Sequence, residues 1–155
     1  MTSINIYTWR GIQLKLLREG AKLPVYSTAG SACFDLFALT EGNNDVIFFP
    51  RERKIINTVL SFEVPSDMAM MLYSRSGQGF NHGVRLANCV GVIDSDYRGE
   101  VKICVTNDGS YPFTIKSGDR VAQGMIIYTP KIMFMESLFL SQTERGDQGF
   151  GSTGI

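Results

Sequence analysis

The sequence predicts an all-β fold, a sandwich or barrel with little helix. Its apolar stretches are short, and turn-forming residues (Gly, Pro, Asn and Asp) separate them at near-regular spacing, which is typical of sandwiches and barrels. Where apolar and polar side chains alternate, the period is two, as in a half-buried strand. The length of 155 residues is that of about one domain.

The first half of the chain contains two predicted strands and one predicted turn of helix. Residues 13–19 alternate apolar and polar side chains, a pattern that fits a strand as well as a single helical turn. Residues 55–64 form a run rich in β-branched side chains that ends before Pro65. Residues 76–80 predict a short helix or turn, because their two glycines disfavour a long helix.

The second half continues the strand pattern. Val101, Ile103 and Val105 alternate with Lys102, Cys104 and Thr106. Residues 113–115 repeat this period of two. Residues 107–110, Asn-Asp-Gly-Ser, predict a turn that joins these two strands.

The composition excludes several classes of function. Fifteen basic and fifteen acidic side chains cancel, so we expect no nucleic-acid partner. No apolar run approaches the roughly 18 residues of a membrane span, so we expect no membrane partner. Three cysteines without paired spacing, and no signal-peptide pattern, predict reduced and buried thiols in a cytoplasmic protein. The single histidine, His82, argues against a histidine-based zinc site, so a hydrolase would use a carboxylate as its base.

The C-terminal tail, residues 145–155, is predicted to be separate from a β domain of residues 1–144. Its sequence, RGDQGFGSTGI, is too rich in glycine for regular packing, so the tail is expected to be mobile in isolation. A frayed end would explain this composition. However, the arginine, the phenylalanine and the freed backbone amides could also bind phosphate and stack on a base.

Five segments follow one another along the chain: AGSACFDLFA (29–38), SRSGQGF (74–80), GVIDSDYRG (91–99), GDRVAQGMI (118–126) and RGDQGFGSTG (145–154). Together they resemble the five motifs of the trimeric deoxyuridine triphosphate nucleotidohydrolases, the dUTPases. The resemblance implies a jelly-roll-like β subunit, a homotrimer with active sites shared between subunits, and Mg²⁺-dependent hydrolysis of dUTP to dUMP and pyrophosphate. This reaction keeps uracil out of DNA and supplies dUMP for thymidylate synthesis.

The resemblance assigns roles in the third segment. Asp94 matches the catalytic base that deprotonates the water attacking the α-phosphorus, a role whose loss costs about 10²–10⁴ in rate. On its own, Asp94 would be interpreted as a turn residue. Asp96 is expected to be a turn residue or an intersubunit partner of a nearby arginine rather than catalytic. Tyr97 matches the aromatic residue that lies against deoxyribose and excludes a 2′-hydroxyl group. The residues that match the uracil-binding hairpin are Asn88, Gly91, Val92, Ile93 and Lys102.

The resemblance also indicates which residues contact the triphosphate and which lies near the metal. The residues expected to contact phosphate are Arg75, Ser76 and Gly77 of the second segment, Gln123 of the fourth and Arg145 of the tail. Asp35 matches the acid near Mg²⁺, bound through water, although a surface strand acid is its simpler interpretation. Residues 118–120 are expected to form a structural turn with an internal ion pair.

In the tail, Phe150 is expected to stack on uracil. Such stacking contributes roughly 1–3 kcal/mol, which would help offset the entropy of ordering a glycine-rich lid. Gly151 and Ser152 are expected to contact substrate when the lid closes. Two positions depart from the family pattern: Ser74 stands where proline is common, and Gln148 where glycine is common.

Three other functions are weighed against this one. A dCTP deaminase of the same fold needs a glutamate that activates water, and Glu100, the nearest candidate, falls at a different place. A binding or regulatory protein that reuses the scaffold would not need to keep Asp94. A structural jelly roll, such as a coat protein, would have no use for the phosphate-and-base tail.

Overall fold

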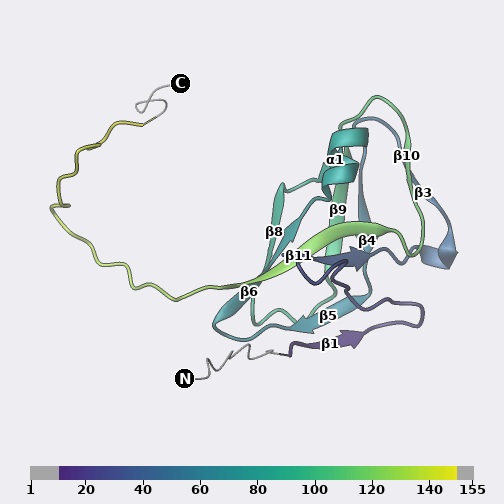
Figure 1. The fold of residues 1–155 in the computed structure, drawn as a ribbon, viewed down its shortest axis with the longest axis horizontal. Helices are drawn as coiled ribbons and strands as arrows, with labels where there is room; N and C mark the ends of the chain where they lie inside the picture. Colours follow the sequence, from purple (N-terminus) through teal and green to yellow (C-terminus); the bar gives the residue numbers. More distant parts are fainter. Residues whose placement is uncertain (1–10, 150–155) are drawn as a thin grey trace, which may run out of the picture.

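The computed structural model describes residues 11–149 and confirms an almost entirely β architecture (Figure 1). Between the strands lie one 3₁₀ turn, η1 (Glu41–Asn43), and one helix, α1 (Ser76–His82). No helix in this range is long and apolar enough to cross a membrane. The strands are β1 (Gln13–Leu16), β2 (Phe34–Phe37), β3 (Val46–Phe48), β4 (Arg53–Asn57), β5 (Leu60–Glu63), β6 (Met68–Tyr73), β7 (Val84–Leu86), β8 (Val90–Ile93), β9 (Lys102–Asn107), β10 (Phe113–Ile115) and β11 (Arg120–Tyr128).

The paired strands are antiparallel and form small sheets. The largest sheet has the order β2-β11-β6-β8, and a three-stranded sheet has the order β4-β9-β7. Strand β1 pairs with β5, and β10 pairs with β3. No two paired strands in the described chain are consecutive in sequence, so the chain crosses repeatedly between sheets, as it does in a jelly roll.

The core is formed by the inward-facing side chains of these strands. The burial predicted for Val101, Ile103 and Val105 is confirmed, because they are at most 2% exposed, but Thr106, predicted for the opposite face, is also buried. Leu36 of β2 and Phe48 of β3 are wholly buried in the same cluster. Full burial of an aliphatic or aromatic side chain contributes about 1.5–3 kcal/mol, so this cluster is the main source of stability in the chain.

The run at residues 55–64 is divided into two strands. A turn separates β4 from β5, and Val59 in this turn has a φ of 57°. The Thr58 hydroxyl donates to the Val101 carbonyl at 2.6 Å, and the Val59 N–H donates to the Glu100 carboxylate at 3.0 Å. These bonds hold the turn, because they satisfy polar groups that leave the strand ladder. Residues 13–16, for which helix and strand were both possible, form strand β1.

The turn predicted at residues 107–110 is present, but the strands on either side of it are not hairpin partners. Strand β9 pairs with β4 and β7, whereas β10 pairs with β3. The wholly buried amide of Asn107 links these layers. Its Nδ2 donates to the carbonyls of Phe48 and Tyr111 at 2.9 and 2.8 Å, and its Oδ1 accepts the Gly109 N–H at 2.9 Å.

The three cysteines are free, but the prediction that they are buried was wrong. Cys89 is exposed, and Cys33 and Cys104 are half-buried. Partial burial raises the pKa of the Cys33 thiol, and the nearby Asp35 carboxylate raises it further.

Beyond β11 the chain leaves the β body as an extended segment (Figure 1). Seven large apolar side chains between residues 132 and 140 are 73–94% exposed. They are Ile132, Met133, Phe134, Met135, Leu138, Phe139 and Leu140. We call residues 132–140 the apolar arm. A contiguous exposed apolar stretch of this size is uncommon on a soluble protein.

Candidate active site

The four-stranded sheet carries predicted site residues at both of its ends. At one end, Gln123 of β11 is paired with Asp35 of β2 and with Tyr73 of β6. At the other end, Asp94 directly follows β8. Because Tyr73 is paired with Val90, the first residue of β8, Asp94 lies four residues further along the strand. At about 3.3 Å per residue, the two ends are about 13 Å apart.

Asp35 is the centre of the first group. Its side chain is 4% exposed, so its carboxylate is almost fully removed from water. Its Oδ1 accepts from Arg75 Nε at 3.2 Å and from Gln123 Nε2 at 3.5 Å. Its Oδ2 accepts from Ser27 Oγ at 2.8 Å and lies 3.5 Å from Arg120 Nε. We call this arrangement the Asp35 cluster; it brings together predicted site residues of the first, second and fourth segments.

The prediction of an ion pair inside the turn at residues 118–120 was wrong, because Arg120 pairs with a residue outside that turn. The Asp119 carboxylate instead accepts the Lys116 N–H at 2.8 Å, which closes the turn, while Arg120 pairs with Asp35. The Arg120 carbonyl also accepts from Gln78 Nε2 at 2.9 Å, so this residue connects β11 to α1. No local pattern indicates the two contacts of Arg120, because its partners Asp35 and Gln78 are far from it in the sequence.

Arg75, Ser76 and Gly77, the predicted phosphate contacts of the second segment, lie where α1 begins. Arg75 is the N-cap residue, with an extended backbone (φ −82°, ψ 129°), and its carbonyl accepts the Gly79 N–H at 3.0 Å. Ser76 and Gly77 are exposed. A Cβ built on Gly77 meets nothing within 4 Å, so this turn is open to a ligand.

Ser74, where the family commonly has proline, is held by a hydrogen bond instead. Its hydroxyl accepts the backbone N–H of Leu86 at 2.9 Å, which joins the end of β6 to β7. Leu86 is 2% exposed, so this N–H has little access to water. The hydroxyl therefore constrains the residue directly before Arg75.

The loop between β7 and β8, together with β8 itself, carries most of the groups that the resemblance assigns to uracil. Asn88 is exposed, Cys89 has a φ of 61°, and the Val90 N–H donates to the Asn88 carbonyl at 2.6 Å. Strand β8 is the edge of its sheet, so its outer backbone groups have no strand partner within the described residues. It contains the three predicted main-chain contacts, Gly91, Val92 and Ile93. Such an edge can satisfy the acceptor–donor–acceptor pattern of uracil.

Asp94 and Tyr97 lie in the turn that follows β8. Asp94 is exposed, its carbonyl accepts the Tyr97 N–H at 3.2 Å, and its carboxylate has no partner among residues 11–149. Tyr97 is 46% exposed, and its hydroxyl donates to the Glu100 carbonyl at 3.0 Å. A Cβ on Gly99 would lie 2.4 Å from that hydroxyl, so glycine is needed for this ring position. The turn presents a free carboxylate and an aromatic face to a ligand.

Glu100 has structural partners, which argues against a deaminase. Its carboxylate accepts the Val59 N–H at 3.0 Å and lies 3.8 Å from Nζ of Lys102, the first residue of β9. A glutamate that holds a turn in this way is not poised to activate water.

The predicted tail contacts lie at or beyond the end of the described chain. Arg145 is exposed, and its Nε donates to the Gln148 carbonyl at 3.0 Å within the C-terminal segment. Phe150, Gly151 and Ser152 lie outside the described residues.

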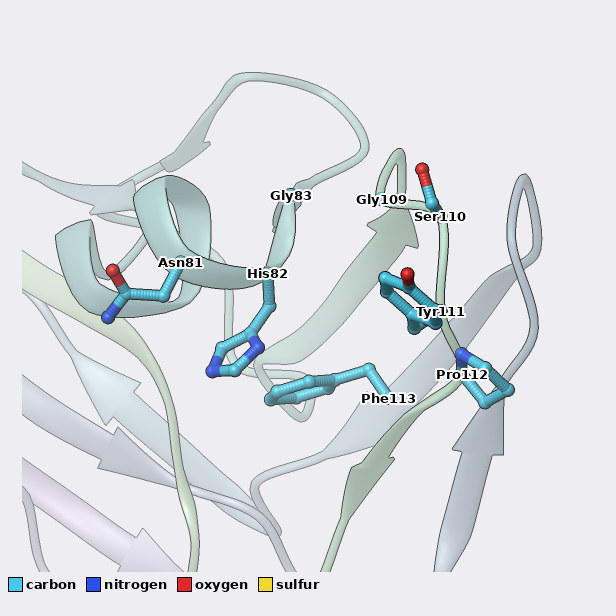
Figure 2. Close-up of a pocket in the computed structure, with 8 residues that line it drawn as sticks. All are labelled: Asn81, His82, Gly83, Gly109, Ser110, Tyr111, Pro112 and Phe113. Carbon is cyan, nitrogen blue, oxygen red and sulfur yellow. The ribbon is translucent and has the colours of Figure 1, made fainter.

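The structure also has a cavity of about 300 Å³ whose lining includes none of the predicted site residues (Figure 2). It lies between the end of α1 and the loop that joins β9 to β10, and the rings of His82 and Phe113 meet in it with centroids 5.1 Å apart. A Cβ on Gly83 would lie 2.7 Å from the Gly109 nitrogen. The close approach of these two glycines fixes the end of α1 against the loop.

The metal prediction for Asp35 does not agree with its surroundings. Residues 11–149 contain no group of three or more His, Cys, Asp or Glu side chains that could hold a metal ion. A carboxylate offers about four lone-pair positions, and each oxygen of Asp35 already faces two donors. Two of these donors, Arg75 and Arg120, are cations that repel a metal. Asp35 therefore does not fit a Mg²⁺ site, either directly or through water.

Comparison with known proteins identifies the family. The family model described as dUTPase matches residues 19–154. The chain belongs to the dUTPase family. The deoxyuridine 5′-triphosphate nucleotidohydrolase of Finegoldia magna is 46% identical over 132 residues, which cover 85% of this chain and 91% of that protein. The protein of the same name from Nautilia profundicola is 42% identical over 143 residues, which cover 92% of this chain and 98% of that protein.

Solved dUTPase structures have the same fold. The Staphylococcus bacteriophage 80alpha dUTPase with dUPNHPP superimposes with a TM-score of 0.80 at 28% identity, covering 94% of this chain and 99% of that chain. A dUTPase from phage phi11 of S. aureus, described with a structural Mg(II) ion, superimposes with a TM-score of 0.77, covering 86% of this chain and 100% of that chain. At 21% identity, the second likeness supports the fold alone. The jelly-roll-like β fold expected of this dUTPase-family chain is confirmed.

Proposed function

We propose that this protein hydrolyses dUTP to dUMP and pyrophosphate, keeping uracil out of DNA and supplying dUMP for thymidylate synthesis. One observation carries the proposal: the dUTPase family match spans residues 19–154 and includes the turn in which Asp94 presents its carboxylate. This turn directly follows the edge strand β8. A base held along that edge places its sugar against Tyr97 and its phosphates beyond the strand end.

Selectivity for deoxyuridine follows from the groups at this edge. The backbone of β8, with the Asn88 amide and the main chain at Lys102, offers donors and an acceptor that match uracil. Cytosine reverses part of that pattern and leaves buried polar groups unpaired, which is costly. The ring of Tyr97 leaves no room for a 2′-hydroxyl, so UTP is rejected by a steric clash. Phe150, with Gly151 and Ser152, closes over the base when the tail binds.

The chemical step is a displacement at the α-phosphorus. Asp94 orients a water molecule and takes its proton as the water oxygen bonds to phosphorus. The bond from phosphorus to the bridging oxygen breaks, and pyrophosphate leaves. Charge that develops on the phosphate oxygens is stabilised by donors already in place, which costs no reorganisation. These donors are Arg75, Ser76, Gly77 and Gln123, joined by Arg145 of the tail.

The active form that we propose is a homotrimer with sites shared between subunits. Two features of the single chain support this. The Asp35 cluster and Asp94 lie at opposite ends of one sheet, about 13 Å apart along its strands. The apolar arm, residues 132–140, is exposed and lies away from the strands of the described chain (Figure 1). Adjacent copies would bring the two ends together and cover the arm.

Mg²⁺ is the proposed cofactor because the family implies it. A hard Mg²⁺ ion keeps several waters and is held largely by substrate phosphates in nucleotide sites, so it would not require the carboxylate of Asp35. No step assigned above to a residue of this chain depends on the ion. The three free thiols support a reducing location such as the cytoplasm.

A direct test is pyrophosphate release with Mg²⁺ from dUTP, dCTP, dTTP and UTP in parallel. We expect rapid release from dUTP alone. Ammonia released from dCTP would instead establish a deaminase. Binding of dUTP without any release would establish the regulatory alternative.

A further inference from the structure

We propose that Asp35 is a positioning residue for the triphosphate-binding groups and does not belong to the metal site. The inference rests on the proposed function, because it concerns the phosphates of the same substrate. It also adds Arg120 to the groups that face those phosphates, a residue that the sequence had placed in a structural turn.

The first argument is that the Asp35 carboxylate is fixed before any ligand binds. Its backbone N–H donates to the Val25 carbonyl at 2.8 Å on one side, and the residue is paired with Gln123 of β11 on the other. The Ser27 hydroxyl, at 2.8 Å, holds Oδ2. With 4% of its side chain exposed, Asp35 has almost no water to exchange for a metal-bound water molecule.

The second argument is the orientation that the carboxylate gives to Arg75. The guanidinium uses its Nε edge to reach Oδ1 of Asp35, so its two terminal nitrogens stay available for a phosphate. The Arg75 side chain is 28% exposed, which leaves this outer edge accessible. Guanidinium groups bind phosphate through two parallel hydrogen bonds when their plane is fixed, and Asp35 fixes that plane.

Arg120 is held in the same way from the other side. Its Nε lies 3.5 Å from Oδ2 of Asp35, and half of its side chain is exposed. Its carbonyl accepts from Gln78 of α1, the helix that begins beside Arg75. The buried carboxylate therefore balances two cations that would otherwise repel each other, and it turns both toward the same end of the sheet. A site with this charge suits a triphosphate.

The test measures binding of the imido analogue dUpNHpp without metal, in EDTA at physiological salt, for wild type and Asp35→Asn. A positioning role predicts that the affinity falls about tenfold to a hundredfold, because a freed guanidinium must be ordered again on binding. Asp35→Asn also makes the site one charge more positive, which by itself would strengthen binding of the triphosphate. Physiological salt screens this opposing effect. Pyrophosphate release should show the same Mg²⁺ concentration for half-maximal activation as wild type, but a higher KM.

A metal role predicts the reverse. Metal-free affinity would then equal that of wild type, and half-maximal activation would need more Mg²⁺; this result would overturn the proposal. Asp45→Asn is the matched control, because Asp45 is an exposed acid paired only with Lys116 among the described residues. It should change neither quantity.

Because Asp35 is buried, Asp35→Asn could fail to fold, so Ser27→Ala is measured beside it. That variant keeps the carboxylate but removes its shortest hydrogen bond. Weaker metal-free binding of the analogue, by about threefold or more, supports positioning, and unchanged binding overturns it. If wild type released no pyrophosphate from dUTP, the proposed function would be rejected; a failure confined to the variants rejects only the role of Asp35.

Discussion

Asp35 and Asp94 are carboxylates at opposite ends of one antiparallel sheet, about 13 Å apart along its strands. Asp35 is buried and faces four donors, whereas Asp94 is exposed and its carboxylate has no partner among residues 11–149. The two acids are therefore suited to different work. A carboxylate that is already saturated can organise cations, and a free one can accept a proton from water.

The first prediction concerns Asp94. We expect Asp94→Asn to lower kcat for pyrophosphate release from dUTP by about 10²–10⁴, because an amide cannot take the proton of the attacking water. The KM should change little, since the change does not remove a phosphate or base contact. Asp96→Asn, two residues further in the same exposed turn, is the matched control and should retain activity. Equal losses in the two variants would show that the turn, rather than the base, had been damaged.

Asp94 and Asp35 differ in how much of their surroundings could be predicted from the sequence. Asp94 lies in a continuous segment, GVIDSDYRG, so its motif and its environment both come from local sequence. The pattern that predicts burial of Val101, Ile103 and Val105 is local as well, and all three are buried. Similarly, the glycines of residues 76–80 correctly predicted that helix α1 would be short.

The surroundings of Asp35 could not be predicted in that way. Its partners Arg75, Arg120 and Gln123 are 40, 85 and 88 residues away, and only strand register brings them together. The turn at Val59 was missed for a related reason. Its positive φ is stabilised by Glu100, 41 residues away, rather than by a local turn signal.

The second prediction separates the tail from the apolar arm. Deletion of residues 145–155 should leave the oligomer intact but lower kcat/KM for dUTP, because it removes Arg145 and Phe150. Deletion of residues 131–155 also removes the apolar arm, whose side chains are 73–94% exposed in the single subunit. We expect this longer deletion to shift the protein toward monomers. Light scattering during gel filtration measures the mass of each variant, and a longer deletion that stayed trimeric would show that the arm is not an intersubunit contact.

The third prediction concerns Ser74. We expect Ser74→Ala to reduce the free energy of unfolding by about 1–3 kcal/mol, because the buried N–H of Leu86 loses its acceptor. The KM for dUTP should also rise, since the residue after Ser74 is Arg75. Urea unfolding at a fixed protomer concentration and steady-state kinetics measure the two effects. Ser74→Thr keeps a hydroxyl and should behave nearly as wild type; if alanine did so too, water would have to be replacing the bond.

The last prediction concerns the glycines that hold the end of α1. A Cβ on Gly109 would lie 2.2 Å from the His82 carbonyl oxygen, a backbone atom that can move only if the loop or the helix moves. We therefore expect Gly109→Ala to lower the free energy of unfolding by about 1–3 kcal/mol, as overpacking commonly does. Gly30→Ala is the control, because a Cβ there meets nothing within 4 Å and should change stability by no more than about 0.5 kcal/mol. Urea unfolding at one protomer concentration compares the two variants, since the stability of an oligomer depends on concentration. Because α1 begins directly after Arg75, a loss of stability without any change in the KM for dUTP would show that the two ends of the helix are independent.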